Sequence, residues 1–225
     1  MQLGGVSPNQ MSQAKPEKHQ SHRFELTGGN VALDFVNTLD DRPGGNPEEL
    51  LNDYSSLAAF AEQNGLLTPQ QFQYFEQHAE LTPDEAETAL HRARDLREAL
   101  HDIFSAAMNK KLAPQSAMDR LNANLHDAAL HSRLVQGETI NPGGRLEWRF
   151  DDPASSFNSV LWPIARAAAD LLASDNLVFV RACSSPTCQW FFLDTSKNHH
   201  RRWCSMKVCG NRAKVRKFYA RKKTA

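Results

Sequence analysis

The chain has 225 residues with 26 Lys and Arg against 26 Asp and Glu, so it carries no net charge, and its composition is that of an ordinary globular protein. No stretch approaches the roughly 20 consecutive apolar residues of a membrane helix, and the first residues lack the apolar core of a secretory signal. We therefore expect a cytoplasmic protein of one large or two smaller domains.

The neutral total conceals two oppositely charged regions. Residues 181–225 contain 12 Lys and Arg and one acidic residue, Asp194, for a net charge of +11. The preceding 180 residues carry 14 basic and 25 acidic groups, or −11. A compact region with this positive charge attracts polyanions such as nucleic acids. A solvated basic tail without a partner is the alternative that charge alone leaves open.

The chain begins with a polar segment that contains few large apolar groups. Such a segment cannot offset the entropy lost on ordering, so we expect a disordered tail over residues 1–21. The folded part is predicted to open with "RFELTGGNVALDFVNTL", in which Leu33, Val36 and Leu39 keep helical spacing. Glycines and prolines around residue 45 then end this helix.

A series of amphipathic helices is predicted next. One begins near residue 47 and ends at Asn64-Gly65, a typical C-terminal cap, and others begin at Thr68-Pro69 and Thr82-Pro83. Further helices are predicted over 116–131 and 157–173, and "LEWRF" alternates as a strand should. The predicted fold class of residues 22–174 is therefore mainly α with a small β component. We expect this domain to fold alone and to bind no nucleic acid.

All four cysteines lie in the basic region, spaced as Cys183-x4-Cys188, then 15 residues, then Cys204-x4-Cys209. Two close pairs separated by a short insert can hold one tetrahedral ion from two sides, and zinc prefers thiolate ligands. Four protein ligands leave no position for an activated water, so the pattern predicts one structural Zn²⁺. Disulfides and four unrelated buried thiols are the alternatives, which a reducing compartment and the close clustering respectively disfavour.

The order of elements around the cysteines is treble-clef-like. "QWFFLD" is strand-like, "TSKN" is a turn, and the sequence after Cys204 predicts a knuckle followed by a helix that starts at Cys209. Val215, Phe218 and Tyr219 fall on one arc of this helix, and we expect them to pack over the metal site. His199 and His200 are alternative metal ligands, although we expect them to be polar loop residues.

The sequence Cys209-Gly210-Asn211-Arg212 is the signature of the CGNR zinc-finger family, and the chain from Arg181 to Lys223 resembles that family along its whole length. Upstream, "GGNVALDFVNTL" resembles the start of the ABATE domain that usually precedes this finger. Proteins of this type are regarded as stress-induced transcriptional regulators. The resemblance implies an ABATE-like, sensor-like domain over residues 22–174, followed by a zinc-dependent DNA-binding finger over 175–225.

We therefore predict a zinc-dependent, DNA-binding transcriptional regulator that responds to stress or to a small effector through its N-terminal domain. The residues expected to contact double-stranded DNA are all cationic: Arg201, Arg202, Arg212, Lys214, Arg216, Lys217 and Arg221. Asn211 and Arg212 have side chains that read bases, but their place beside a metal ligand is equally typical of residues that brace the knuckle.

Two further features concern effector binding and assembly. The resemblance to a sensor domain places a small-effector pocket at Phe35, Asn37 and Thr38. A homodimer is expected because a single finger has a small footprint, and a second half-site multiplies affinity.

Other functions remain open. An RNA-binding zinc module and a zinc-stabilised protein-interaction adaptor fit the same charge pattern. Enzymatic activity is not expected, because the histidines of the N-terminal domain are scattered and form no triad or metal spacing.

Overall fold

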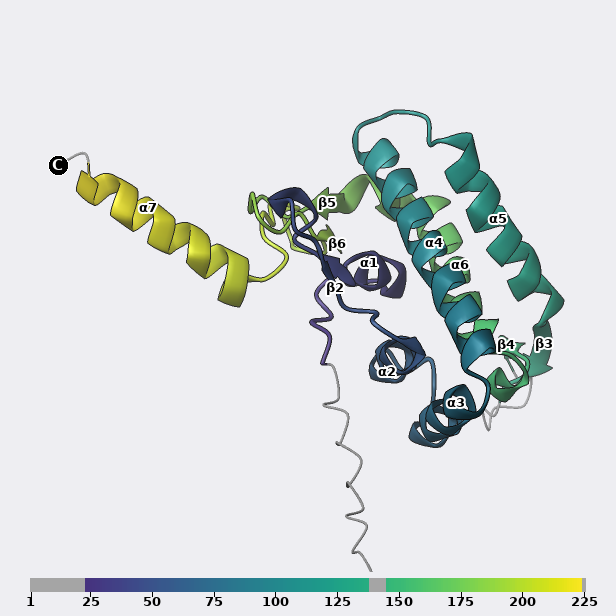
Figure 1. Ribbon diagram of the computed structural model, residues 1–225. Helices are drawn as coiled ribbons and strands as arrows, with labels where there is room; N and C mark the ends of the chain where they lie inside the picture. Colours follow the sequence, from purple (N-terminus) through teal and green to yellow (C-terminus); the bar gives the residue numbers. More distant parts are fainter. Residues whose placement is uncertain (1–22, 138–144, 224–225) are drawn as a thin grey trace, which may run out of the picture.

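The computed structural model describes residues 23–137 and 145–223 (Figure 1). The tail predicted over residues 1–21 lies outside these ranges. The α-helices are α1 (Val31–Val36), α2 (Tyr54–Gln63), α3 (Pro69–Leu81), α4 (Pro83–Met108), α5 (Gln115–Leu130), α6 (Leu161–Leu172) and α7 (Asn211–Lys223). Short antiparallel pairs join β1 (Leu39–Asp40) to β2 (Glu48–Glu49), β3 (Ser132–Gln136) to β4 (Leu146–Phe150), and β5 (Val180–Ala182) to β6 (Phe191–Leu193). The predicted mainly helical class with a small β component is confirmed.

Local sequence sets where several helices begin. The side chains of Thr68 and Gln71 form a reciprocal capping box at the start of α3, each accepting a hydrogen bond from the other residue's backbone N–H. Pro69 and Pro83 stand in the first turns of α3 and α4, where a missing N–H costs nothing. The helix starts predicted at Thr68 and Thr82 are therefore confirmed, but only Thr68 caps its helix: the Thr82 hydroxyl donates backward to the carbonyl of His78 at 2.9 Å.

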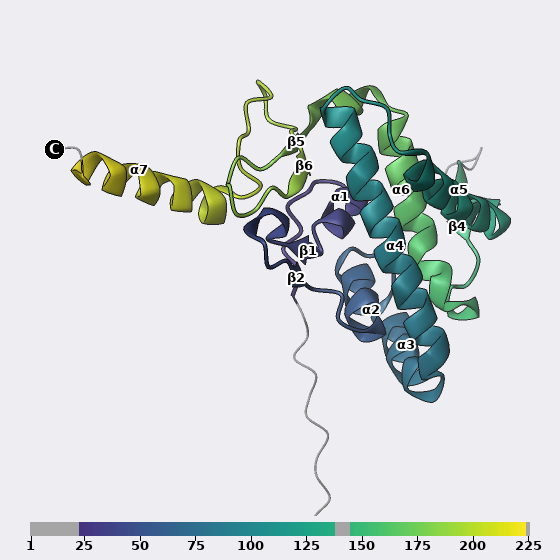
Figure 2. The ribbon, with the colours of Figure 1, turned by 45° about the horizontal axis from the view of Figure 1, so that its top comes forward.

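Helix α4 is central to the helical part of the molecule, and the other helices pack around it (Figures 1 and 2). Helices α5 and α6 pack together along α4, while α2 and α3 contact it elsewhere. The largest fully buried side chains include Phe35, Phe60, Phe104 and Trp162. Since burying one such side chain contributes about 1.5 to 3 kcal/mol, the apolar faces of these helices determine how they pack.

An ion-pair network centred on the buried Arg97 fastens the β1–β2 hairpin to α4. Arg97 is 3% exposed and donates to both carboxylate oxygens of Glu49, at 2.6 and 2.7 Å. It also donates to Glu98 at 3.1 Å, and Arg42 holds Glu98 from the other side at 2.7 Å. Burial opposes ionisation of Glu49, but the hydrogen bonds and charge of Arg97 prevail and keep the pKa of Glu49 below its ordinary value.

The C-terminal region shares the main hydrophobic core with the helices. Val180 of β5 and Phe191 of β6 belong to the same buried cluster as α1 and α4, and the Phe191 ring stacks on His101 with their centroids 5.2 Å apart. A second, smaller cluster comprises the four cysteines and Phe192. Residues on both sides of the boundary predicted at 174 and 175 therefore contribute to one core.

Helix α7 extends from this body into solvent (Figures 1 and 2). Its connection to the body is a helical turn, Met206–Gly210. Within the described ranges, no helix combines the length and the apolar character needed to cross a membrane.

Candidate metal centre

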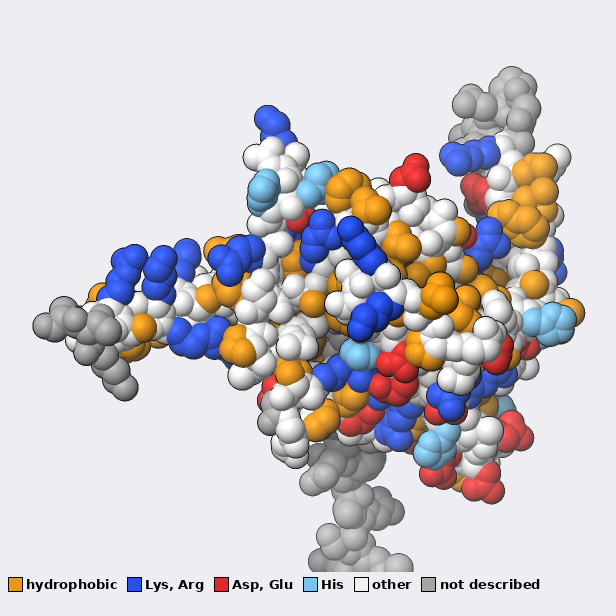
Figure 3. Space-filling view, turned by 90° about the horizontal axis from the view of Figure 1, so that it is seen from above, with side chains coloured by type: hydrophobic (Ala, Val, Ile, Leu, Met, Phe, Trp, Pro, Cys, Tyr) orange, Lys and Arg blue, Asp and Glu red, His pale blue; other side chains and the backbone are white. Residues whose placement is uncertain are grey.

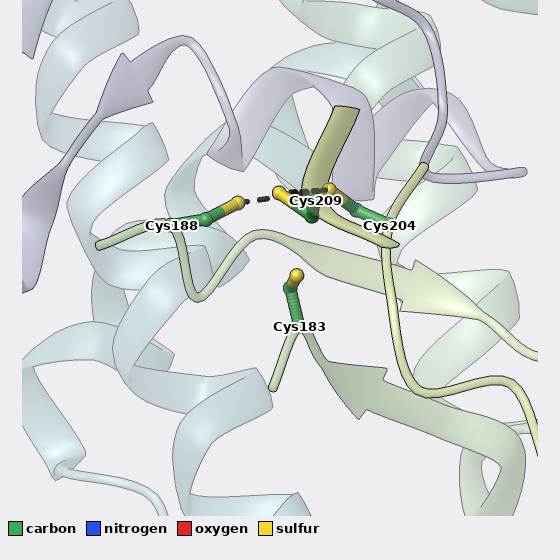
Figure 4. A group of neighbouring side chains, drawn as sticks. All are labelled: Cys183, Cys188, Cys204 and Cys209. Atoms are coloured by element: carbon green, nitrogen blue, oxygen red, sulfur yellow. Dashed lines mark hydrogen bonds between the residues drawn. The ribbon is translucent and has the colours of Figure 1, made fainter. Parts of the chain in front are cut away.

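Four separate backbone segments bring the cysteine side chains together. Cys183 directly follows β5, Cys188 lies in the turn before β6, Cys204 lies in the loop after the hairpin, and Cys209 lies in the turn that leads into α7. All four are buried, and their Sγ atoms lie within 4.8 Å of one another. Figure 4 shows the four sulfur atoms directed toward a common centre.

The spacing of the sulfur atoms fits a zinc ion. The Sγ atom of Cys204 lies 3.6 Å from that of Cys188 and 3.7 Å from that of Cys209. A tetrahedron with Zn–S bonds of about 2.3 Å has S–S edges of about 3.8 Å, whereas a disulfide requires about 2.05 Å. The cysteines are free thiols, so the cluster is a four-cysteine site for one structural Zn²⁺. The predicted cofactor is thus supported by the donor set and by its geometry.

The electrostatics of the cluster also favour a bound cation. Hydrogen bonds from the thiols of Cys188 and Cys204 lower the pKa of Cys183. Hydrogen bonding to Cys183 raises the pKa of Cys188 and of Cys204. Four thiolates this close together repel one another, so a divalent cation is needed to hold them all deprotonated.

Two family models match the chain. One covers residues 29–175 and is the ABATE family, described as "Putative stress-induced transcription regulator". The chain belongs to the ABATE family. The other match is the CGNR zinc finger, over residues 180–222. A comparison with curated proteins finds no match. Below, residues 29–175 are the ABATE region and residues 180–222 are the CGNR finger.

The opening motif of the ABATE region binds the finger's hairpin. The Asn37 side chain donates to the carbonyl of Phe191 at 2.9 Å and accepts from the N–H of the same residue at 2.8 Å. Nearby, the N–H of Leu193 donates to the carbonyl of Gly28 at 2.7 Å. The Asn37 amide thus pairs with β6 in the way that a neighbouring strand would.

This arrangement corrects the predicted effector pocket. Phe35, Asn37 and Thr38 are 0%, 4% and 1% exposed, respectively. Phe35 belongs to the core, Asn37 holds the hairpin, and the Thr38 hydroxyl donates to the carbonyl of Phe35 at 2.7 Å. Their side chains therefore serve packing and docking and leave no space for a ligand. The sequence motif was informative, but it marks a docking surface for the finger.

Asp34 supports the same contact from within α1. Its carboxylate accepts a hydrogen bond from the N–H of Gly28 at 2.7 Å. Burial raises the pKa of Asp34 to about 6, although backbone hydrogen bonds and the charge of Arg201 oppose the shift. A Cβ atom at position 28 would lie 2.9 Å from both the backbone and the carboxylate of Asp34, which explains why glycine stands there.

Arg201, one of the cations predicted to contact DNA, has a structural role in the fold. Its guanidinium donates to the carbonyls of Thr27 and Trp203, each at 2.9 Å, and also to that of Cys204. The same group lies over the Phe192 ring, 4.3 Å from its centroid. Arg201 therefore connects the metal knuckle to the segment just before the ABATE region, and these bonds use its Nε and Nη2 donors. Arg202, its neighbour in sequence, is exposed and lies 5.3 Å from the Trp203 ring centroid.

The histidines beside the knuckle are not metal ligands. Among the described residues, the group that could hold a metal contains only the four cysteines. The Nδ1 atom of His199 lies 2.7 Å from the carbonyl oxygen of Asp194, and its ring stacks on Phe179 with 3.8 Å between centroids. His200 is an exposed loop residue, as predicted.

Asn211 and Arg212 of the signature lie at the junction between knuckle and helix. The Asn211 amide donates to the carbonyl of Lys207 at 3.0 Å and so braces the turn. Arg212 lines a small cavity beside the cysteines together with Glu25 and Asp40. The first observation favours the bracing role for Asn211, whereas the exposed Arg212 stays among the cations proposed to contact DNA.

Helix α7 presents the remaining predicted cations to solvent. Lys214, Arg216, Lys217 and Arg221 are all exposed, and Figure 3 shows basic side chains along the projecting helix. The apolar arc expected to cover the metal site does not do so: Val215, Phe218 and Tyr219 are 53%, 55% and 62% exposed. Helical periodicity located the arc correctly, but the direction in which α7 leaves the knuckle carries it away from the body.

Proposed function

We propose that this ABATE protein is a transcriptional regulator whose CGNR finger binds double-stranded DNA when zinc is bound. The observation that carries the proposal is the isolated, cationic helix α7. It extends from a rigid metal knuckle, and the exposed side chains of Arg212, Lys214, Arg216, Lys217 and Arg221 surround it. A helix with this charge repels itself unless phosphates or other anions are close.

The dimensions of α7 suit a duplex. Its 13 residues correspond to about 20 Å of helix, which spans the width of the major groove of about 12 Å. Arg202 adds an exposed cation next to the knuckle, whereas Arg201 is left out of the proposed contacts because its Nε and Nη2 donors bind backbone carbonyls. The ABATE region carries most of the acidic residues and is expected to face away from DNA.

A salt titration tests the proposal. If about five cations reach phosphates, log K for duplex DNA should fall with log salt concentration at a slope of about −4 to −5. Changing Lys214, Lys217 and Arg221 to Gln should reduce the magnitude of that slope by about two to three and leave the zinc content unchanged.

Lys110→Gln with Lys111→Gln is the matched control, because these exposed cations follow α4 in the body of the molecule. An unchanged slope in the α7 variant would mean that α7 does not contact DNA. Comparing duplex with single-stranded RNA in the same titration distinguishes the RNA-binding alternative.

A protein-interaction adaptor is the second candidate, and one observation favours it. Val215, Phe218 and Tyr219 are apolar side chains that phosphate binding does not require, and they lie exposed on α7. If a protein partner covers them, Phe218→Ser should abolish its binding without altering the salt slope for DNA. Dimerisation through a second finger would serve DNA binding by adding a second half-site.

A further inference from the structure

A cavity with a volume of about 400 Å³ lies between α2, α3 and α4 of the ABATE region. Every residue that lines it falls between Asn52 and Arg94, so it contains no metal ligand and no part of the finger. Its volume is within the range of small-molecule sites, about 300 to 1,000 Å³. It is separate from the effector pocket predicted at the opening motif.

The floor of the cavity is apolar and aromatic. Tyr54, Ala86 and Leu90 are buried there, and Ala79 and Pro83 extend the apolar surface toward the rim. The Tyr54 hydroxyl donates to the carbonyl of Phe157 at 2.8 Å. Since that hydroxyl is engaged elsewhere, Tyr54 offers the cavity a ring and no polar group.

The wall of the cavity is predominantly anionic. Its carboxylates are those of Asp53, Glu76, Glu80 and Glu87, against one arginine and one histidine. The arginine, Arg94, directs its guanidinium to the carbonyl of Leu51, at 2.6 and 3.1 Å. The same guanidinium lies 3.6 Å from the Glu49 carboxylate, so a carboxylate outside the cavity balances the charge of Arg94.

Three of these carboxylates have capacity for a ligand. Glu76 accepts a hydrogen bond from the Ser55 hydroxyl at 3.0 Å, which leaves its second oxygen available. Within residues 23–137 and 145–223, Glu80 forms no ion pair. Glu87, itself exposed, lies 3.6 Å from the exposed His91, its one ion-pair partner in the described part of the chain. An apolar floor bordered by acids with few cationic partners is complementary to a molecule with an apolar body and a positive head.

We propose that this cavity binds an organic ammonium ion with an aromatic or aliphatic body. The ammonium group lies between Glu76 and Glu80, where it gains charge-assisted hydrogen bonds, and the body rests on Leu90 and the Tyr54 ring. This site is the effector site of the proposed regulator, and in that sense it rests on the proposed function. A neutral or anionic molecule of the same shape lacks the favourable charge interaction.

The experiment compares 2-phenylethylamine with 3-phenylpropanoate, which is similar in size and opposite in charge. Titration of the zinc-loaded full chain by calorimetry or NMR should give a Kd of about 1 mM or lower for the amine, a modest value for about nine non-hydrogen atoms. The acid should bind at least about tenfold more weakly. Equal affinity for the two probes, or no binding of the amine, would overturn the proposal.

Variants locate the site. Glu76→Gln combined with Glu80→Gln should weaken amine binding by about fivefold or more, while Asp95→Asn, an exposed acid of α4 that does not line the cavity, should not change it. Ala79→Phe should abolish binding by filling the cavity, and its thermal unfolding shows whether the fold is kept. Amine binding that survives both changes places the ligand elsewhere and refutes the site.

Failure of this inference is distinguishable from failure of the proposed function. The DNA titration of the unmodified chain is performed without the amine and depends on α7. If the amine does not bind but duplex DNA does, the effector site is refuted and the DNA-binding proposal is unaffected.

Discussion

Replacing Asn37 with Ala tests whether the ABATE motif holds the finger in place. The change removes a donor and an acceptor, so both the carbonyl and the N–H of Phe191 lose their partner in a buried position. An unpaired buried polar group costs about 1 to 3 kcal/mol, so the two together should destabilise the chain by about 2 to 6 kcal/mol. That is a large part of the roughly 5 to 15 kcal/mol that typically separates folded from unfolded protein.

The expected consequence extends to the metal. Phe191 lies between Cys188 and Cys204 in the chain, so a loosened β6 should weaken zinc retention as well as lower the unfolding free energy. Urea denaturation gives the first quantity, and competition with a chromogenic chelator gives the second.

Asn37→Asp and Asn122→Ala complete the comparison. Asp keeps an acceptor for the Phe191 N–H but sets a carboxylate against its carbonyl, so it should also destabilise. Asn122 is exposed on α5, and its replacement should change stability by less than about 0.5 kcal/mol. If Asn37→Ala unfolds and releases zinc like the Asn122→Ala control, the docking role assigned to the motif is refuted.

Three further predictions concern the metal, a buried acid and the arginine pair. Cys204→Ser should lose zinc and also lower the melting temperature of the ABATE region, because Phe191 belongs to the shared core; an unchanged melting temperature would show that the two regions are uncoupled. Asp34 has a pKa near 6 when folded and about 3.8 otherwise, so the folded state binds more protons between these values and stability should fall as pH rises through the window. Asp34→Asn should remove this pH dependence, which amounts to about 3 kcal/mol. If the free energies of unfolding of wild type and variant differ by the same amount from about pH 4 to about pH 6.5, the prediction is contradicted. Arg201→Gln should lower the melting temperature and leave the slope of log K for DNA against log salt concentration unchanged. Arg202→Gln should reduce the magnitude of that slope by about one and leave the melting temperature unchanged. The opposite pattern would reverse the roles assigned to the two residues.

The sequence by itself determined the metal site and the starts of α3 and α4, whereas the helix predicted to begin near residue 47 begins at Tyr54, after β2. Zinc coordination depends on a few residues close together in the chain, so the spacing of Cys183, Cys188, Cys204 and Cys209 was sufficient to predict the ligand set. Helix-start signals are equally local: the Thr68 cap and Pro69 predicted the start of α3, and Pro83 marks the start of α4, where Thr82 forms no side-chain cap.

Only the tertiary structure decided what the motif and the arginines do. Asn37 and Phe191 are 154 residues apart, and no local pattern shows that an amide in one segment completes the hydrogen bonds of a strand in another. Arg201 and Arg202 are adjacent residues of the same type, and the sequence does not distinguish them. In the fold, Arg201 donates to three backbone carbonyls, whereas the Arg202 side chain is exposed to solvent. Likewise, periodicity places Val215 on an apolar arc, but only the direction of the chain after the knuckle determines whether that arc meets the body or projects away from it, because packing depends on contacts between distant segments.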